Sequence, residues 1–395
     1  NVSRENGGSR WWSLLGLNGV LASSLILSFY TVIAGWGLAY FVESIQGSFI
    51  GINAEQVGIH FNSLLSNPME LLFWHTVVSA ITIIIVARGV KSGIEKAINF
   101  MIPGLLLILF VLLGYATTTG FFGESFSFLF SPDFSKLTWG SVLTAMGHAF
   151  FTLSIGLGVM MVYGSYLSKE YSIVKAGLWI ALADTVVALL AGLVIFSIVF
   201  ANGLEPGSGP GLLFQTLPVA FGEMNGGWFF GTLFFALIVM AALSSSISLM
   251  EPAVSWFDQN WGIKRIHSAW VLGGLIWFIG VGTVLSFNEW SDIHFLGERN
   301  FFESMDFLTA NIMLPLGGLL MVVFAAWVLS DETRKEQLSM SKWRMDKFVL
   351  ILKWVAPVAV MVVFASNLVS GVDLIPTLIV IFAIYAIYVW KVCKS

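Results

Sequence analysis

Residues 147–166, GHAFFTLSIGLGVMMVYGSY, place hydroxyl groups and glycines inside a stretch that is apolar enough to cross a membrane. Thr152 and Ser154 precede Gly156 and Gly158. A helix interrupted in hydrocarbon is tolerated only where it lines a cavity, and its freed amides and carbonyls can then bind an ion or a charged substrate. The alternative is close packing of two helices through small residues, which the stretch on its own favours. The residues described next favour the break.

A carboxylate and a tyrosine lie inside two other apolar stretches. Asp184 stands in the otherwise apolar residues 179–193, which contain no Lys or Arg. A charge at that depth costs at least ~2.5 kcal/mol unless it is paired, protonated or ion-bound, so a cation ligand is the expected role. Tyr30 follows Ile26 by four residues and shares its helix face. Its hydroxyl needs a partner, either on another helix, which is the commoner role, or on a substrate.

A patch of small residues at 241–249 carries the hydroxyls of Ser244, Ser245 and Ser248. Hydroxyl and carbonyl oxygens suit a hard cation such as Na⁺. The alternative is that each serine bonds back to its own helix, which is the commoner role of a single serine. Glu251 and Pro252 follow directly.

Composition places these residues in a membrane. Hydrophobic residues make up 57% of the chain, charged residues 11%, and the mean hydropathy is +0.87. This balance is typical of a polytopic membrane protein and excludes an ordinary soluble domain. A single cysteine, Cys393, excludes a disulfide framework. The histidines are scattered and no phosphate loop or nucleophile elbow occurs, so we expect no enzyme.

Apolar segments near the spanning length of ~20 residues lie at about 11–41, 68–87, 97–120, 139–163, 173–201, 227–257, 266–287, 303–329, 348–369 and 373–391. If the Asn1 end is cytoplasmic, only Lys136 and Arg299 of the 19 Lys and Arg fall in outer connections, and Lys353 falls within a span. This asymmetry predicts that both chain ends are cytoplasmic. In the outer connection 202–226, the apolar residues 212–221 predict a re-entrant lid or, equally, an amphipathic surface helix.

The chain resembles the neurotransmitter:sodium symporters with the leucine-transporter fold, in their prokaryotic branch. The resemblance covers nearly the whole chain and is densest in residues 147–166, LSSSISLMEP (243–252), RGVKSGIEKA (88–97), SPDFSKL (131–137) and LSFYTVIAGW (27–36). It implies an all-α, polytopic membrane protein with an inverted-repeat fold and ten spans in this chain. It also implies that the first two helices of the family are missing.

The resemblance divides one transmembrane domain, 1–395, into a cytoplasmic loop (1–10), the remainder of the first repeat (11–120), the second repeat (139–329) and two additional helices (348–391). The substrate-binding residues that it implies are Ile26, Tyr30, Phe151, Thr152, Ser154, Leu157, Ser245 and Leu249. Tyr30 would bind the substrate carboxylate, and Phe151 would cover the substrate.

Two sodium sites follow from the same resemblance. Thr152 and Asp184 match the first, although many members have Asn at the second of these positions. Ala241, Ser244 and Ser245 match the second site, and Ser244 stands where many members have Thr or Asp. Ala188 and His148 depart from the residues typical of chloride-dependent members, which leaves chloride use open.

The gate residues that the resemblance implies are Tyr30, Phe151, Asp306 on the outer side, and Tyr166 with Asp258 or its neighbour Gln259 on the inner side. A surface acid is the alternative for Asp306.

The function implied is sodium-coupled symport of a neutral, hydrophobic L-amino acid across the cell membrane by alternating access. Its partners are the amino acid, the lipid bilayer and the two missing helices, and no nucleic acid is expected. The alternative is a truncated or non-transporting relative that acts as a sensor or an inactive fragment. We expect the 395-residue chain alone not to transport, because half of each ion site is lacking.

Overall fold

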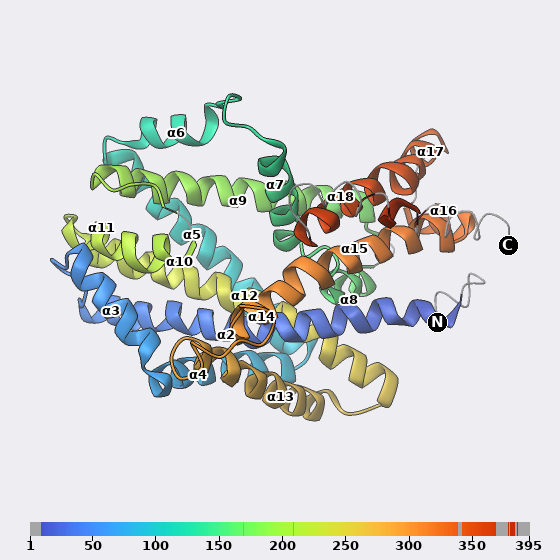
Figure 1. The fold of residues 1–395 in the computed structure, drawn as a ribbon, viewed down its shortest axis with the longest axis horizontal. Coiled ribbons are helices and arrows are strands. Elements are labelled where there is room, and N and C mark those ends of the chain that lie inside the picture. Colours follow the sequence, from blue (N-terminus) through green and yellow to red (C-terminus); the bar gives the residue numbers. More distant parts are fainter. Residues whose placement is uncertain are drawn as a thin grey trace. The chain divides into compact units, whose positions relative to one another are not determined.

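A computed structural model describes residues 9–168, 170–207, 209–338, 342–368, 378, 380–383 and 385. The described residues are almost entirely helical, and the isolated bridge between Leu296 and Arg299 is the one β-type pairing among them. The helices are η1 (Arg10–Trp12), α2 (Ser13–Gln46), α3 (Ala54–Ser66), α4 (Pro68–Ala87), η2 (Val90–Glu95), α5 (Lys96–Thr118), α6 (Phe122–Phe130), α7 (Trp139–Thr152), α8 (Gly158–Tyr166), α9 (Ile173–Ala201), α10 (Gly209–Gly211), η3 (Leu212–Thr216), α11 (Leu217–Glu223), α12 (Gly227–Trp261), α13 (Arg265–Ser286), α14 (Phe301–Asp306), η4 (Phe307–Met313), α15 (Leu314–Val323), η5 (Phe324–Val328), α16 (Asp331–Leu338), α17 (Lys342–Leu350), η6 (Ile351–Val355) and α18 (Ala356–Leu368) (Figure 1).

Eight helical stretches in the described residues are long and apolar enough to cross a membrane. They coincide with eight of the ten segments expected from the sequence. The segment at 139–163 is instead divided into α7 and α8, of 14 and 9 residues, and each is too short to span alone. Most of the segment at 373–391 lies outside the described residues. The all-helical architecture is therefore confirmed, with eight helices of spanning length in the described residues.

The chain forms two compact units. The first contains residues 1–23, 135–184 and 305–395, and the second contains residues 24–134 and 185–304. Within the second, α4 and α13 lie side by side, and α12 packs against both and against α5 (Figure 1). Within the first, α15 packs against α7 and α18.

An aromatic cluster forms the core of the second unit and includes Trp36, Tyr40, Phe61, Phe214 and Phe235. Their ring centroids are separated by 5.1–6.4 Å in the contacts that Tyr40 makes with Phe61, Phe214 and Phe235. Aromatic pairs at such distances contribute beyond the area that they bury.

The loop segment 212–221 is built into this core. Phe214, Leu217 and Phe221 are buried, and the amide of Gly51 donates to the carbonyl of Gly222 at 3.0 Å. The alternative of an amphipathic helix on the surface is therefore wrong, since this apolar segment packs inside the unit as η3 and α11.

Five stretches, η2 to η6, are π-helices, in which each turn holds an additional residue. Three of them end two residues before a proline, at Thr216 before Pro218, Met313 before Pro315, and Val355 before Pro357. Proline lacks an N–H and clashes with the carbonyl of the preceding turn, so a widened turn relieves the clash without ending the helix.

Candidate functional site

The broken helix expected within 147–166 is present. Helix α7 ends at Thr152 and α8 begins at Gly158, and residues 153–157 between them are not helical. Ser154 has φ of 54° and Gly156 has φ of 91°, so both adopt the left-handed region. This conformation is unusual for serine and natural for glycine, which identifies Gly156 as the residue that permits the break.

The unwound segment also packs closely, so the alternative interpretation of its glycines is correct as well. A Cβ added to Gly156 would lie 2.1 Å from the carbonyl oxygen of Leu314, and one added to Gly317 would lie 2.4 Å from the carbonyl oxygen of Gly156. Asn18 supports this contact from α2, where its Nδ2 donates to the carbonyl of Met313 at 3.1 Å. The glycines therefore serve both the break and the backbone contact.

Several predicted site residues of the first unit lie in or next to this segment. Leu157 is buried, whereas Phe151 is 41% exposed and Thr152 is also exposed. The Thr152 hydroxyl makes only a long contact, of 3.5 Å, with the carbonyl of Ala149. Asp184 lies half-buried on α9 and forms no hydrogen bond or ion pair with Thr152 in the described residues. Their assignment to one sodium site stays a prediction.

The predicted residues of the second unit do come together. The hydroxyls of Tyr30 on α2 and Ser245 on α12 interact, and Tyr30 packs beside Ala242 and Leu243. The partner that a tyrosine inside a span requires is thus a serine on another helix. Ile26 is 1% exposed, and Leu249 is buried as well.

The serines of α12 bond to their own helix. Ser244 Oγ donates to the carbonyl of Ala241 at 2.8 Å, and Ser248 Oγ donates to the carbonyl of Ser244 at 3.0 Å. These bonds match the back-bonding alternative. The Ala241 carbonyl accepts both from Ser244 Oγ and, within α12, from the amide four residues on, so it binds a cation only if the Ser244 hydroxyl turns away.

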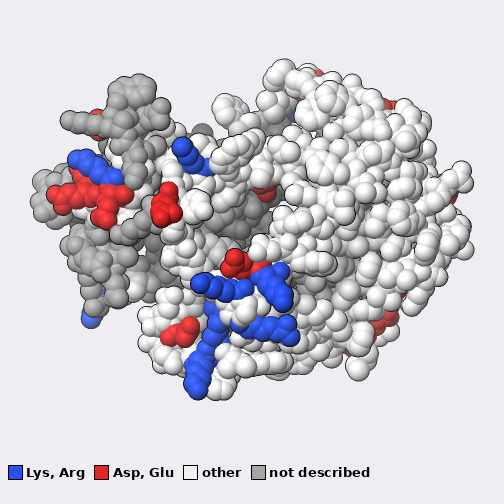
Figure 2. Space-filling view, turned by 180° about the vertical axis from the view of Figure 1, so that it is seen from behind, with Lys and Arg blue, Asp and Glu red and all other residues white. Residues whose placement is uncertain are grey.

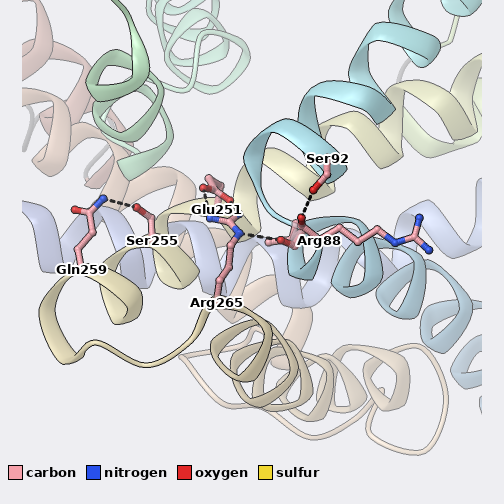
Figure 3. Close-up of polar contacts among 7 residues, drawn as sticks. Arg88, Ser92, Glu251, Ser255, Gln259 and Arg265 are labelled. Atoms are coloured by element: carbon pink, nitrogen blue, oxygen red, sulfur yellow. Dashed lines mark hydrogen bonds and ion pairs between the residues drawn. The ribbon is translucent and has the colours of Figure 1, made fainter.

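The expected gate residues Asp306, Tyr166 and Asp258 lie at or near helix ends, whereas Tyr30 lies within α2. Asp306 is exposed at the end of α14, and Tyr166 is 39% exposed at the end of α8. Asp258 is exposed near the end of α12, and its carbonyl accepts from the amide of Gly262 at 3.1 Å. The Nε2 of Gln259 donates to Ser255 Oγ at 3.0 Å (Figure 3).

One ion pair escaped the sequence analysis. Glu251 is fully buried, and Arg265 donates from Nη1 to its Oε1 at 3.0 Å and from Nη2 to its Oε2 (Figure 3). The Arg265 Nε also donates to the carbonyl of Val86 at 2.9 Å. A carboxylate inside an apolar run, with an arginine at the start of the next helix, was the available signal. Through Arg265, the start of α13 is bonded both to Glu251 on α12 and to the last turn of α4.

The model of the sodium:neurotransmitter symporter family matches residues 51–377. An uncharacterised sodium-dependent transporter of Bacillus subtilis, YhdH, is 37% identical over 363 residues, which are 90% of this chain and 79% of that protein. An uncharacterised sodium-dependent transporter of Haemophilus influenzae is 30% identical over 377 residues, which are 93% of this chain and 81% of that protein.

A solved structure agrees with these sequence relatives. The crystal structure of MhsT in complex with L-phenylalanine is 40% identical, has a TM-score of 0.82, and is matched over 91% of this chain and 82% of that one. This chain belongs to the sodium:neurotransmitter symporter family.

Proposed function

We propose that this protein is a sodium-coupled symporter that carries a neutral, hydrophobic L-amino acid across the cell membrane by alternating access. The unwound segment 153–157 carries the proposal, because an interrupted span provides backbone groups for an ion and a substrate carboxylate. The family and the amino acid bound to MhsT support the same substrate class.

The proposed substrate-binding residues fall into two groups. The Tyr30 hydroxyl, next to Ser245, receives the substrate carboxylate, and the buried Ile26 and Leu249 form an apolar wall. The family resemblance assigns the buried Leu157 to the side-chain pocket and Phe151 to the cover of the substrate. An apolar wall specifies size loosely, since one methylene is worth about 1–3 kcal/mol of discrimination.

Two sodium ions complete the proposal. Thr152 and Asp184 bind the first, together with the substrate carboxylate, so that ion and substrate attract each other directly. The Ala241 carbonyl, Ser244 and Ser245 bind the second. Each ion that moves inward contributes about 2.3 kcal/mol per 100 mV of membrane potential.

The proposed gates are Asp306 outside and Tyr166 with Asp258 inside. We propose a single transmembrane domain with inverted repeats and ten spans, and cytoplasmic chain ends.

Uptake by proteoliposomes tests the proposal. The full-length protein is reconstituted, and uptake of labelled leucine, tryptophan and alanine is measured with and without an inward Na⁺ gradient. Three variants are compared, Asp184→Ala, Asp184→Asn, which keeps an oxygen ligand, and Asp292→Ala, which removes an exposed loop carboxylate.

Na⁺-driven uptake that is lost in Asp184→Ala, partly kept in Asp184→Asn and unchanged in Asp292→Ala supports the symporter and its first sodium site. Uptake that depends on neither Na⁺ nor Asp184 refutes the coupling. Na⁺-dependent binding of leucine without any uptake would instead favour the non-transporting sensor.

A further inference from the structure

Two turns of the second unit are fastened to each other. The carbonyl of Val86, in the last turn of α4, accepts from Arg265 Nε at 2.9 Å and from the amide of Gly89 at 3.1 Å. Arg265 begins α13, so its bond to Val86 holds the turn after α4 beside the turn before α13. Arg265 also binds Glu251 on α12 (Figure 3). Residues that follow α4 and precede α13 therefore occupy one surface.

This surface is cationic. Its exposed basic residues, which form no ion pair in the described part of the chain, are Arg88, Lys91, Lys96 and Lys264. Figure 3 shows the Arg88 side chain directed away from the pair formed by Arg265 and Glu251. Figure 2 shows Lys and Arg side chains gathered in a group on one face of the molecule.

Acidic residues on the same turns do not cancel this charge. Glu95 and Asp258 are exposed there, so two carboxylates stand against the four unpaired cations. The Glu251 carboxylate is already matched by Arg265 and adds nothing to the field outside. The surface keeps a net positive charge, which a bound anion would reduce.

Apolar side chains border the cations. Trp261 is 61% exposed, Trp270 and Ile266 are each 51% exposed, and Phe100 is 77% exposed. Trp261, Ile266 and Trp270 lie near the ends of spans that are apolar enough to cross a membrane, and Phe100 lies further inside another. Tryptophan at a span end is typical of the level of the lipid headgroups. The surface therefore offers cations to a phosphate and apolar contacts to an acyl chain.

We propose that Arg88, Lys91 and Lys264 bind the headgroup phosphate of an anionic phospholipid, with Trp261 and Trp270 against its glycerol and acyl region. The apolar border favours a lipid over a soluble phosphate or an acidic peptide, neither of which uses it. The site rests on the multi-pass membrane character of the family and not on the proposed substrate.

Native mass spectrometry of the purified protein tests the site, with phosphatidylglycerol, phosphatidylcholine and glycerol 3-phosphate added in separate arms. The triple variant Arg88→Gln, Lys91→Gln, Lys264→Gln is compared with a control that removes the same charge from exposed residues elsewhere, Arg10→Gln, Lys175→Gln, Lys335→Gln. The positive-inside pattern assigns all six to the same side of the membrane. Arg88→Lys tests whether charge alone suffices.

We expect the site triple to weaken phosphatidylglycerol binding by about 100-fold, since each basic residue near an anionic lipid contributes roughly fivefold. The control triple and Arg88→Lys should keep most of the binding, and phosphatidylcholine should bind weakly to every variant. The proposal is overturned if both triples lose binding equally, which indicates general surface charge, or if glycerol 3-phosphate binds as tightly as phosphatidylglycerol. Unchanged thermal unfolding midpoints in the absence of lipid show that the variants fold. Since no arm measures transport, failure here leaves the symporter proposal standing.

Discussion

Replacing Gly156 by alanine is the sharpest test of the unwound segment. Alanine at a left-handed φ costs roughly 1–2 kcal/mol. The new Cβ would also lie 2.1 Å from the carbonyl oxygen of Leu314 and 2.9 Å from the amide nitrogen of Gly318. Both are backbone atoms that cannot rotate away, and overpacking of this kind costs about 1–3 kcal/mol. The expected loss of stability is therefore about 2–5 kcal/mol.

The assay is the thermal unfolding midpoint of the purified protein in detergent. Gly147→Ala is the matched control, because a Cβ there meets no atom within 4 Å and the residue lies within α7. Alanine in a helix is favoured over glycine by up to ~1 kcal/mol, so this control should be neutral or stabilising. Gly156→Asn separates the cost of the positive φ from the cost of the Cβ clash. Asparagine tolerates a positive φ yet still carries a Cβ, so a lower midpoint in this variant reports mainly the clash. If Gly156→Ala unfolds at the same temperature as Gly147→Ala, the backbone contact with α15 is refuted.

Three further predictions concern the second unit. Gly280→Ala in α13 should lower the unfolding midpoint, because its Cβ would lie 2.5 Å from a backbone carbonyl of α2 and 2.6 Å from an imidazole carbon of α4, whereas Gly274→Ala, with no atom within 4 Å, should not. Glu251→Gln should cost up to about 3–5 kcal/mol, because it leaves Arg265, whose side chain is 17% exposed, without its counter-charge. A midpoint equal to that of the exposed control Glu95→Gln contradicts this. A carboxylate partner 2.8 Å away raises the pKa of His60 above its ordinary value, so the pair stabilises the fold in full below pH ~6.5 and the gain disappears as the pH rises through the raised pKa. The difference in midpoint between the wild type and His60→Gln should shrink over that window, and a difference independent of pH argues against the pair.

The break at 153–157 is predictable from sequence, because glycine and hydroxyl residues in an apolar run conflict with a continuous helix. The partner of the break is not predictable in this way. Leu314 and Gly317 lie far from Gly156 in the sequence, and a glycine in an apolar segment usually indicates ordinary helix packing. Only the fold shows that Gly156 packs against them. Local patterns specify where a helix ends, and tertiary contacts specify what it touches.

For the polar residues, too, the sequence indicates that a partner is needed but not which residue it is. A tyrosine inside a span predicts that a partner exists, and the structure supplies Ser245. Glu251 gave a weaker signal, because it precedes Pro252 and could mark the end of a span. Its pairing with Arg265 depends on how α12 and α13 turn around Gly262, which a reading of single segments does not specify.

The π-helix η4 separates Asp306 from the proline-containing start of α15. It holds one residue more than a regular helix would need, and each residue of an α-helix advances by 1.5 Å and turns by about 100°. Relaxation of η4 to regular helix would therefore rotate α14 relative to α15 by about 100° and shift it by about 1.5 Å. The additional residue allows a change of register, through which the end of this span that carries Asp306 can reorient while α15 stays packed. Deletion of one residue within Phe307–Met313 should accordingly be tolerated in folding, whereas the same deletion within α9 should not.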